Sequence, residues 1–293
     1  MSIATECMTV NIHMGMWEAR KQDKAAGQEV SANANAKPGT ASVNKQIIPK
    51  EALAKIQARY SAIYNHVRVH TVPWKDNGDR LLSRKMWTRF IEIYEELAAA
   101  FNKEVNDWVE NEYPVLLGKA QFDMGALFNP NDYPDPHVIK GKFYVRLVMD
   151  AVTEAGDFRC NLKDTDVADR IRKDIEANIG QRLKKAQGEV WGKLDNMVAH
   201  YAERMKSDGR LYESTRDNLI ELCDILPGLN VFDDSDLRAM GKEIKQRLGG
   251  YDTADLRKDK DLKSAAAAEA DEILERMSGF LKAFNNDTGD DKD

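Results

Sequence analysis

One apolar repeat in the second half of the chain constrains the fold more than any other feature. From about residue 165 to residue 206, bulky apolar side chains recur every three or four positions without a proline, after a cap cluster at residues 164–166. That period is typical of one face of an α-helix. A continuous helix over this range would be roughly 60 Å long at 1.5 Å per residue. Three glycines weaken it and mark where it would bend: Gly180, Gly188 and Gly192.

The stripe on this helix predicts contact with other helices. A compact 33.1 kDa globule needs no helix of that length, so we expect an elongated helical bundle or coiled coil. Exposed parts of the stripe would bury against a partner helix, which predicts protein partners and a homo-oligomer. The expected self-association face comprises Ile175, Ile179, Leu183, Val190 and Leu194.

Further helices and two strands are expected elsewhere, which makes the fold class mainly α. Apolar stripes with helical spacing predict helices over about 49–67, 83–114, 213–226, 235–248 and 261–284. Strict alternation of apolar and polar residues predicts strands over 7–14 and 142–150. Since a lone strand leaves its backbone groups unpaired, we expect these two to pair as a small two-stranded antiparallel or mixed element lying on the helices.

The expected organisation is a series of consecutive segments. Residues 23–46 are rich in Ala, Asn, Gly and Ser, and they bury too little apolar surface to offset the entropy of ordering them, which predicts a flexible loop. The whole series is an N-terminal strand and helix entry (1–22), the flexible loop (23–46), a helical core with the small sheet (47–160), the long helix with a helical hairpin (161–250), a C-terminal helix (251–284) and a disordered acidic tail (285–293).

The stretch FNPNDYPDP, residues 128–136, interrupts the helical pattern with three prolines. Because proline fixes its own φ angle, the stretch predicts a rigid corner that Phe128 and Tyr133 anchor to the core. Turns that combine proline with aromatic residues also meet partners, so a recognition loop built on the same two residues is the alternative.

Composition excludes some classes of function. The net charge of -6 disfavours a dedicated binder of duplex DNA or of a membrane surface, whose affinity comes from clustered Lys and Arg. The N-terminus lacks the pattern of a signal peptide, and about 18 consecutive apolar residues occur nowhere. Three widely spaced cysteines indicate a reduced, cytosolic chain.

Sequence motifs of catalysis or cofactor binding are not found. The chain has no Walker A sequence, no GxGxxG after a strand, no GxSxG and no zinc pattern, so we assign no catalytic residue, cofactor or metal. His66 and His70 lie four apart on an expected helix, but no third ligand is indicated and both are interpreted as structural or surface residues. The acidic run FDDSDL, 232–237, lacks the glycine and glutamate of a calcium loop and is interpreted as a helix cap.

Local basic clusters leave a second functional class open. They would line a groove for single-stranded nucleic acid, with Trp74, Trp87 or Trp191 as stacking platforms. Acidic residues interrupt each cluster, which favours a solvated face instead. The candidate nucleic-acid contacts are Arg80, Arg84, Lys85, Arg89, Arg182, Lys184 and Lys185, and a further cluster comprises Arg170, Arg172 and Lys173.

Several segments together resemble an uncharacterised protein family encoded by tailed bacteriophages. The resemblance rests on WEARKQD, PWKDNGDRLL, LFNPNDYP, GDFR and LPGLNVFDDSDL, and it spans most of residues 8–248. It implies an early or accessory phage protein in the host cytoplasm, and it supplies no catalytic residue. Our leading hypothesis is a non-enzymatic, self-associating helical interaction protein. The first alternative is a single-stranded nucleic-acid-binding protein of phage replication or recombination, and an enzyme ranks third.

Overall fold

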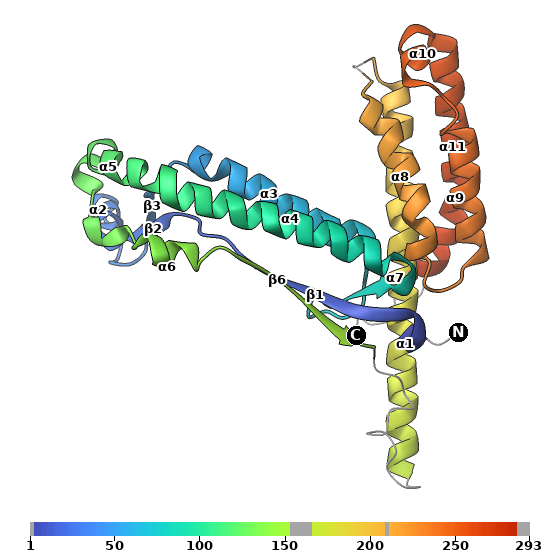
Figure 1. Ribbon diagram of the computed structural model, residues 1–293, viewed down its shortest axis with the longest axis horizontal. Coiled ribbons are helices and arrows are strands. Elements are labelled where there is room, and N and C mark those ends of the chain that lie inside the picture. The colour runs from blue at the N-terminus through green and yellow to red at the C-terminus, as the bar shows by residue number, and fades with distance from the viewer. Residues whose placement is uncertain (1–2, 153–165, 209–210, 286–293) are drawn as a thin grey trace. The chain divides into compact units, whose positions relative to one another are not determined.

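The computed structural model describes residues 3–152, 166–208 and 211–285 (Figure 1). The chain divides into two compact units, and each is built from separate stretches of sequence. Unit 1 comprises residues 1–11, 68–88 and 149–293, and unit 2 comprises residues 12–67 and 89–148. The units therefore interleave along the chain and do not follow the consecutive segments expected from composition. The mainly helical class is confirmed.

Unit 1 is organised around α7 (Asp166–Lys206), which is 41 residues long and continuous through its three glycines, as the apolar repeat predicts. It is followed by α8 (Glu213–Leu229), α9 (Ser235–Arg247), α10 (Thr253–Lys258) and α11 (Lys260–Asn285). A short helix, α1 (Ile3–Glu6), begins the described chain. The expected cap residues Asp164 and Thr165 and the acidic tail beyond residue 285 lie outside the described residues.

Helix α11 runs antiparallel to the second half of α7. Trp191 of α7 stacks on Phe280 of α11 with 4.6 Å between ring centroids, and Lys206 Nζ lies 2.6 Å from Asp271 Oδ1 further along both helices. Figure 1 shows the first half of α7 extending past α8, α9 and α11. The core of unit 1 forms where these helices meet, around buried residues that include Trp191, Leu194, Tyr201, Ile244, Ile273 and Met277.

Unit 1 also carries most of a four-stranded sheet in the order β4-β5-β1-β6. Its strands are β1 (Cys7–Gly15), β4 (Val72–Pro73), β5 (Arg80–Ser83) and β6 (Tyr144–Ala151). The expected pairing of the two alternating segments is confirmed, because β1 and β6 are neighbours. The pair is not an isolated two-stranded element, however, since β5 joins β1 on its other side in antiparallel register, with Cys7 opposite Ser83 and Val10 opposite Arg80.

Unit 2 packs its helices around a core of aromatic side chains. The edge of Trp17 meets Trp108 at 6.3 Å and Tyr113 at 6.0 Å between ring centroids. The helix expected to end near Pro114 instead continues as one π-helical turn and a further helix. Because proline lacks a backbone N–H, the π turn directly before it accommodates the missing helical bond. The helical elements are α3 (Ala54–His70), α4 (Trp87–Asp107), the π turn (Trp108–Glu112), α5 (Tyr113–Met124) and α6 (Pro136–Lys140).

The segment expected to be a flexible loop, residues 23–46, contains regular structure. It includes α2 (Lys24–Asn33) and β3 (Val43–Gln46), and β3 pairs antiparallel with β2 (Arg20–Asp23). The Asp23 side chain caps α2 by accepting a hydrogen bond from Ala26 N at 3.0 Å. Ser31 Oγ accepts from Ala41 N at 3.1 Å and donates to Gly27 O at 2.8 Å. Polar contacts hold this segment in place where apolar burial is scarce.

Candidate interaction surfaces

The first half of α7 presents apolar side chains to solvent. Val167 is 49% exposed and Ile171 is 37% exposed, and the two lie one helical turn apart on the same face. Ile175 follows four residues later and is half-buried. Among the described residues, the core of unit 1 draws its α7 members from Ile179 onward. Residues 166–178 therefore form an amphipathic helix end that contributes nothing to that core.

The self-association face expected from the sequence is split by this arrangement. Val190 and Leu194 are fully buried within the chain, in the core that α7 shares with α8, α9 and α11, so they are corrected from interface to core residues. Ile179 and Leu183 are partly buried and pack against the same core. The sequence could not show which part of the stripe α11 covers, because the apolar period is the same along the whole helix.

A small pocket lies between α7 and the turn after β4, and it brings together residues that the sequence singled out separately. The Arg182 guanidinium carbon lies 5.9 Å from the centre of the Trp74 ring. Lys185 Nζ lies 3.1 Å from Asp76 Oδ1. The pocket has a volume of about 290 Å³ and is lined by Pro73, Trp74, Lys75, Asp76, Asn178, Gln181, Arg182 and Lys185.

The turn that carries Trp74 is held rigidly by its own hydrogen bonds. Trp74 N and Lys75 N both donate to Asp79 O, at 2.8 and 3.1 Å. Gly78 adopts a φ of 95°, which favours glycine, and Asn11 Nδ2 donates to Asp79 Oδ1 at 2.9 Å. Burial alone would raise the pKa of Asp79, but hydrogen bonds from Asn11, Lys75 and Asn77 outweigh it and lower that pKa. The wall of the pocket is therefore preorganised.

Arg80 has a structural role rather than the predicted nucleic-acid contact. Its guanidinium donates to Thr71 Oγ1 at 2.6 Å and to Thr71 O at 2.9 Å, and it lies 3.6 Å from Glu189. Lys193 donates to Arg68 O at 2.8 Å and to Thr71 O at 3.1 Å, so two cations cap the last carbonyls of α3. Burial and the nearby Arg80 charge lower the pKa of Lys193 to about 8.

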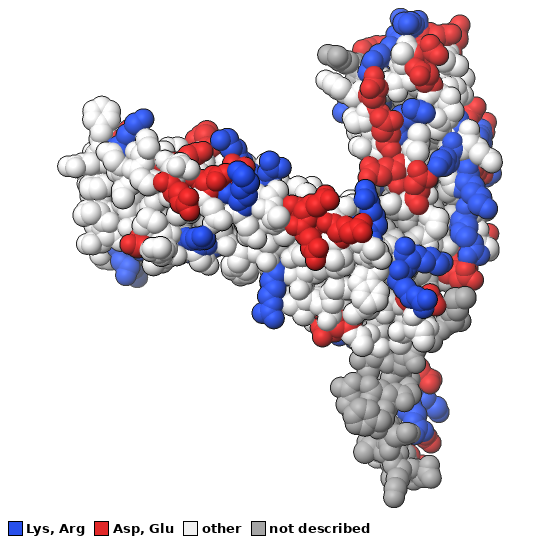
Figure 2. Space-filling model, in the orientation of Figure 1, with Lys and Arg blue, Asp and Glu red and all other residues white. Residues whose placement is uncertain are grey.

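The other candidate nucleic-acid contacts lie outside this pocket. Arg84, Lys85 and Arg89 are exposed near the start of α4. Lys184 is exposed on α7 but does not line the pocket that holds Arg182 and Lys185. On the face of unit 1 that Figure 2 shows, acidic and basic side chains both occur. Arg182 and Lys185 share a pocket with the aromatic residue Trp74.

Two of the three tryptophans proposed as stacking platforms are enclosed. Trp191 is fully buried, and its Nε1 donates to Asp234 Oδ2 at 2.9 Å. Trp74 is 5% exposed and lies beneath Arg182, so its ring orients a guanidinium instead of receiving a base. Trp87 is 40% exposed.

Of the two expected anchors in the proline-rich loop 128–136, Tyr133 packs against the core of unit 2, whereas Phe128 is not among the described residues that do so. Phe128 and Tyr133 pack on each other with 5.5 Å between ring centroids, and Tyr113 Oη donates to Pro134 O at 2.9 Å. Lys45 ties the loop to the β2–β3 pair, with its Nζ at 2.8 Å from Asp132 Oδ2, 3.4 Å from Asp23 Oδ2 and 2.8 Å from Leu127 O. These contacts fit a rigid corner, and a recognition loop built on Phe128 and Tyr133 stays the alternative.

An exposed apolar surface on α5 was missed by sequence reasoning. Helix α5 buries Tyr113 and Ala120, while Phe122 is 91% exposed and Val115 is 56% exposed. The sequence does contain a signal for this surface, namely the run Val115 to Leu117 followed by Phe122. Apolar residues at these positions point to more than one side of a helix, so a single buried face cannot cover them all.

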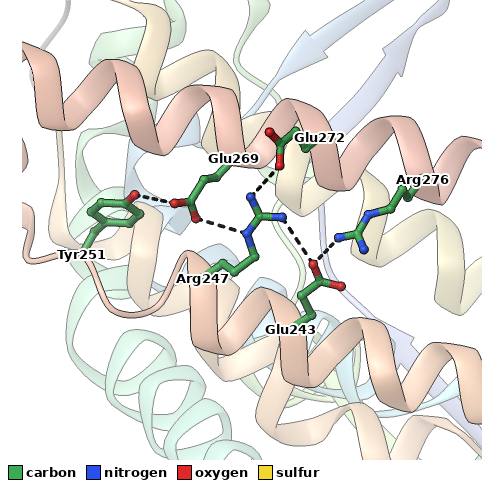
Figure 3. Close-up of polar contacts among 6 residues, drawn as sticks. All are labelled: Glu243, Arg247, Tyr251, Glu269, Glu272 and Arg276. Carbon is green, nitrogen blue, oxygen red and sulfur yellow. Dashed lines mark hydrogen bonds and ion pairs between the residues drawn. The ribbon is translucent and has the colours of Figure 1, made fainter.

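Paired carboxylates occur between α9 and α11, but cations compensate them (Figure 3). Arg247 Nη2 lies 2.7 Å from Glu272 Oε2, and the same guanidinium lies 3.3 Å from Glu243 and 3.4 Å from Glu269. Tyr251 Oη donates to Glu269 Oε1 at 2.9 Å. A hydrogen bond from Arg276, together with those from Arg247, lowers the pKa of Glu243, so this carboxylate stays ionised and acts as a brace between helices.

Other catalytic chemistry finds little support in the described part of the chain. His66 Nε2 lies 3.0 Å from Phe90 O and its ring stacks on Phe90, in keeping with a structural histidine. Burial raises the pKa values of the free thiols of Cys7 and Cys223 to about 11, so both are poor nucleophiles. Over residues 3–152, 166–208 and 211–285, no group of three His, Cys, Asp or Glu side chains is placed to hold a metal ion.

Among the helices that the structure describes, none combines the length and the apolar character needed to cross a bilayer. Comparisons with models of protein families, with curated proteins and with solved structures gave no match for this chain.

Proposed function

We propose that this protein is a non-enzymatic helical interaction protein that self-associates through the first half of α7. The observation that carries the proposal is the exposure of Val167 and Ile171 on a helix end that lies outside the core of its own unit. A role as an accessory protein in bacteriophage-infected cells is part of the proposal, and it rests on the sequence resemblance alone.

The spacing of the apolar residues suits a helical partner. Val167, Ile171, Ile175 and Ile179 follow one another at intervals of four, so they form one stripe along α7. Two copies of the same stripe can face each other across a two-fold axis, as homo-oligomers commonly do. Each Å² of apolar surface removed from water would contribute about 25 cal/mol, which favours pairing over exposure.

The test replaces Val167 and Ile171 by glutamate and measures mass by sedimentation velocity. We expect the wild-type protein to sediment with a mass above 33.1 kDa and the V167E/I171E variant to sediment as a monomer. The helical circular dichroism signal should be retained, because neither residue belongs to the core. Ile179 and Leu183 are unsuitable for this purpose, since charges there would also disrupt packing within the chain.

A matched control is Val30→Glu on α2. Val30 is 49% exposed, as Val167 is, but it lies in unit 2. V30E should sediment like the wild-type protein. A wild-type protein that stays monomeric at all concentrations, or a V167E/I171E variant that keeps the wild-type mass, would contradict the proposal.

A further inference from the structure

The Trp74–Arg182 pocket holds polar groups that are free to bind a ligand. Arg182 is held over the indole ring of Trp74, and among the described residues its guanidinium makes no hydrogen bond or ion pair. Asn178 and Gln181 are exposed on α7 beside it, and their side-chain amides likewise have no protein partner in the described part of the chain. A planar guanidinium fixed on an aromatic ring and flanked by amides is suited to bind an anion through several hydrogen bonds.

The charges around the pocket favour an anionic ligand. Its lining contains Lys75, Arg182 and Lys185, of which Lys75 lies 3.0 Å from Asp79 and Lys185 lies 3.1 Å from Asp76. These groups together leave one positive charge at the pocket, in a chain of net charge -6. The Lys185–Asp76 pair is largely solvated, with side-chain exposures of 70% and 96%. Such exposed pairs contribute little to stability. Lys185 can therefore exchange Asp76 for a ligand at small cost.

The size of the pocket limits the ligand to a compact group. A volume of about 290 Å³ lies at the lower end of the range for small-molecule sites, and Trp74 is too buried to stack on a base. A tetrahedral oxyanion matches the donors available, because Arg182 can engage two of its oxygens while Lys185 supplies a point charge. The side chains of Asn and Gln also commonly donate to phosphate oxygens.

We propose that the Trp74–Arg182 pocket binds a phosphate group through Arg182 and Lys185, with Asn178 and Gln181 as further donors. This site is independent of the apolar stripe on α7 that carries the proposed self-association. A phosphate group reaches such a pocket either on the backbone of single-stranded nucleic acid or as a free phosphate ion.

Two measurements on the full chain test the site and distinguish these sources. The first is the fluorescence anisotropy of a labelled twelve-nucleotide oligothymidylate titrated with protein at about 50 and 200 mM salt, a range in which phosphate-driven affinity falls steeply. The second is the melting temperature with inorganic phosphate against chloride at equal ionic strength, because a ligand that binds the folded state stabilises it. Both are repeated on the R182Q/K185Q variant and on K258Q/K282Q, which removes two exposed cations of unit 1 outside the pocket.

Oligothymidylate affinity that falls at least tenfold in R182Q/K185Q and less than twofold in K258Q/K282Q would support the site with a polynucleotide as the source. A rise in melting temperature with phosphate that R182Q/K185Q abolishes and K258Q/K282Q retains would support the same site with free phosphate as the source. The proposal would be overturned if the wild-type protein responded to neither probe. It would also be overturned if R182Q/K185Q responded to both probes as strongly as the wild-type protein does.

Discussion

Asp234 joins the start of α9 to the middle of α7. Its Oδ1 accepts from Asp236 N at 2.9 Å and from Leu237 N at 3.0 Å, which caps the helix. Its Oδ2 accepts from Gln187 Nε2 at 2.7 Å and from Trp191 Nε1 at 2.9 Å. The sequence predicted the cap from the run FDDSDL. It could not predict the two bonds to α7, because they depend on where that helix passes.

Replacing Asp234 by alanine should destabilise unit 1 by about 2–4 kcal/mol. A lost cap costs about 1 kcal/mol, and the buried indole N–H left without an acceptor costs about 1–3 kcal/mol more. The measurement is urea unfolding followed by circular dichroism. Asp236→Ala, an exposed neighbour in the first turn of α9, serves as the control and should change stability by less than about 0.5 kcal/mol.

The stability that the Asp234 carboxylate contributes should depend on pH. Burial alone would raise the pKa of Asp234, but hydrogen bonds from Leu237 N, Gln187, Trp191 and Asp236 N outweigh it and hold that pKa below its usual value. A lowered pKa in the folded state means that the stabilisation is present above the unfolded pKa of about 3.9 and is lost as pH falls through the folded value. The difference between wild type and D234A should therefore shrink below about pH 4. A constant difference down to pH 2 would contradict this account.

At the scale of elements, glycines show how closely the helices of unit 1 approach one another. A Cβ on Gly241 of α9 would lie 2.5 Å from Leu226 Cδ2 of α8, so any larger residue there would force the buried Leu226 side chain to move. On α7, a Cβ on Gly180 or Gly192 would have no described atom of another element within 4 Å. Replacing glycine by alanine is therefore expected to have opposite effects on stability at the two places, depending on how closely a neighbouring helix approaches.

We expect G241A to destabilise the protein by about 1–3 kcal/mol, because the added methyl forces α8 and α9 apart. By contrast, G192A should stabilise it by about 0.5–1 kcal/mol through its higher helix propensity. Denaturant midpoints of the two variants, measured side by side, check both signs. If G241A were as stable as G192A, the close approach of α8 and α9 would be wrong.

The elements also show which parts of the fold the sequence could predict. The continuity of α7 and the pairing of β1 with β6 follow from apolar periods that extend over many residues. Strand β5 was missed because RLLS is short and does not alternate. Helix α2 was missed because it depends on Asp23, Ser31 and Lys45, whose bonding partners are remote or not predictable from composition. The Trp74–Arg182 pocket was missed as a site, although its basic residues were identified, because its two walls are about a hundred residues apart in the sequence.

At the scale of the whole molecule, the two units have separate cores. Ile56, Phe101 and Trp108 belong to the core of unit 2, and Trp191 and Tyr201 belong to that of unit 1. Separate cores imply that the free energy of unfolding can differ between the units, so one transition need not describe the chain.

Truncating Phe101 to alanine should cost unit 2 about 3–5 kcal/mol, because the side chain is fully buried. Amide hydrogen exchange read by mass spectrometry should then show lost protection in α3 and α4, with α8 and α11 unchanged. Tyr201→Ala is the reciprocal variant and should show the reverse pattern. Equal loss of protection in both units after either substitution would indicate a single cooperative molecule.

The interleaving of the units has a consequence for how the chain is made. The last residue of unit 2 is residue 148, whereas unit 1 needs residues from both ends of the chain. At a synthesis rate of about 5–20 residues per second, roughly 7–27 s separate the emergence of residue 148 from that of residue 285. During that interval Cys7, Val72 and Leu81 await the helices that bury them in the finished protein. When residue 148 has emerged from the ribosome, the nascent chain therefore presents all residues of unit 2 together with an apolar N-terminal strand that has not yet been buried.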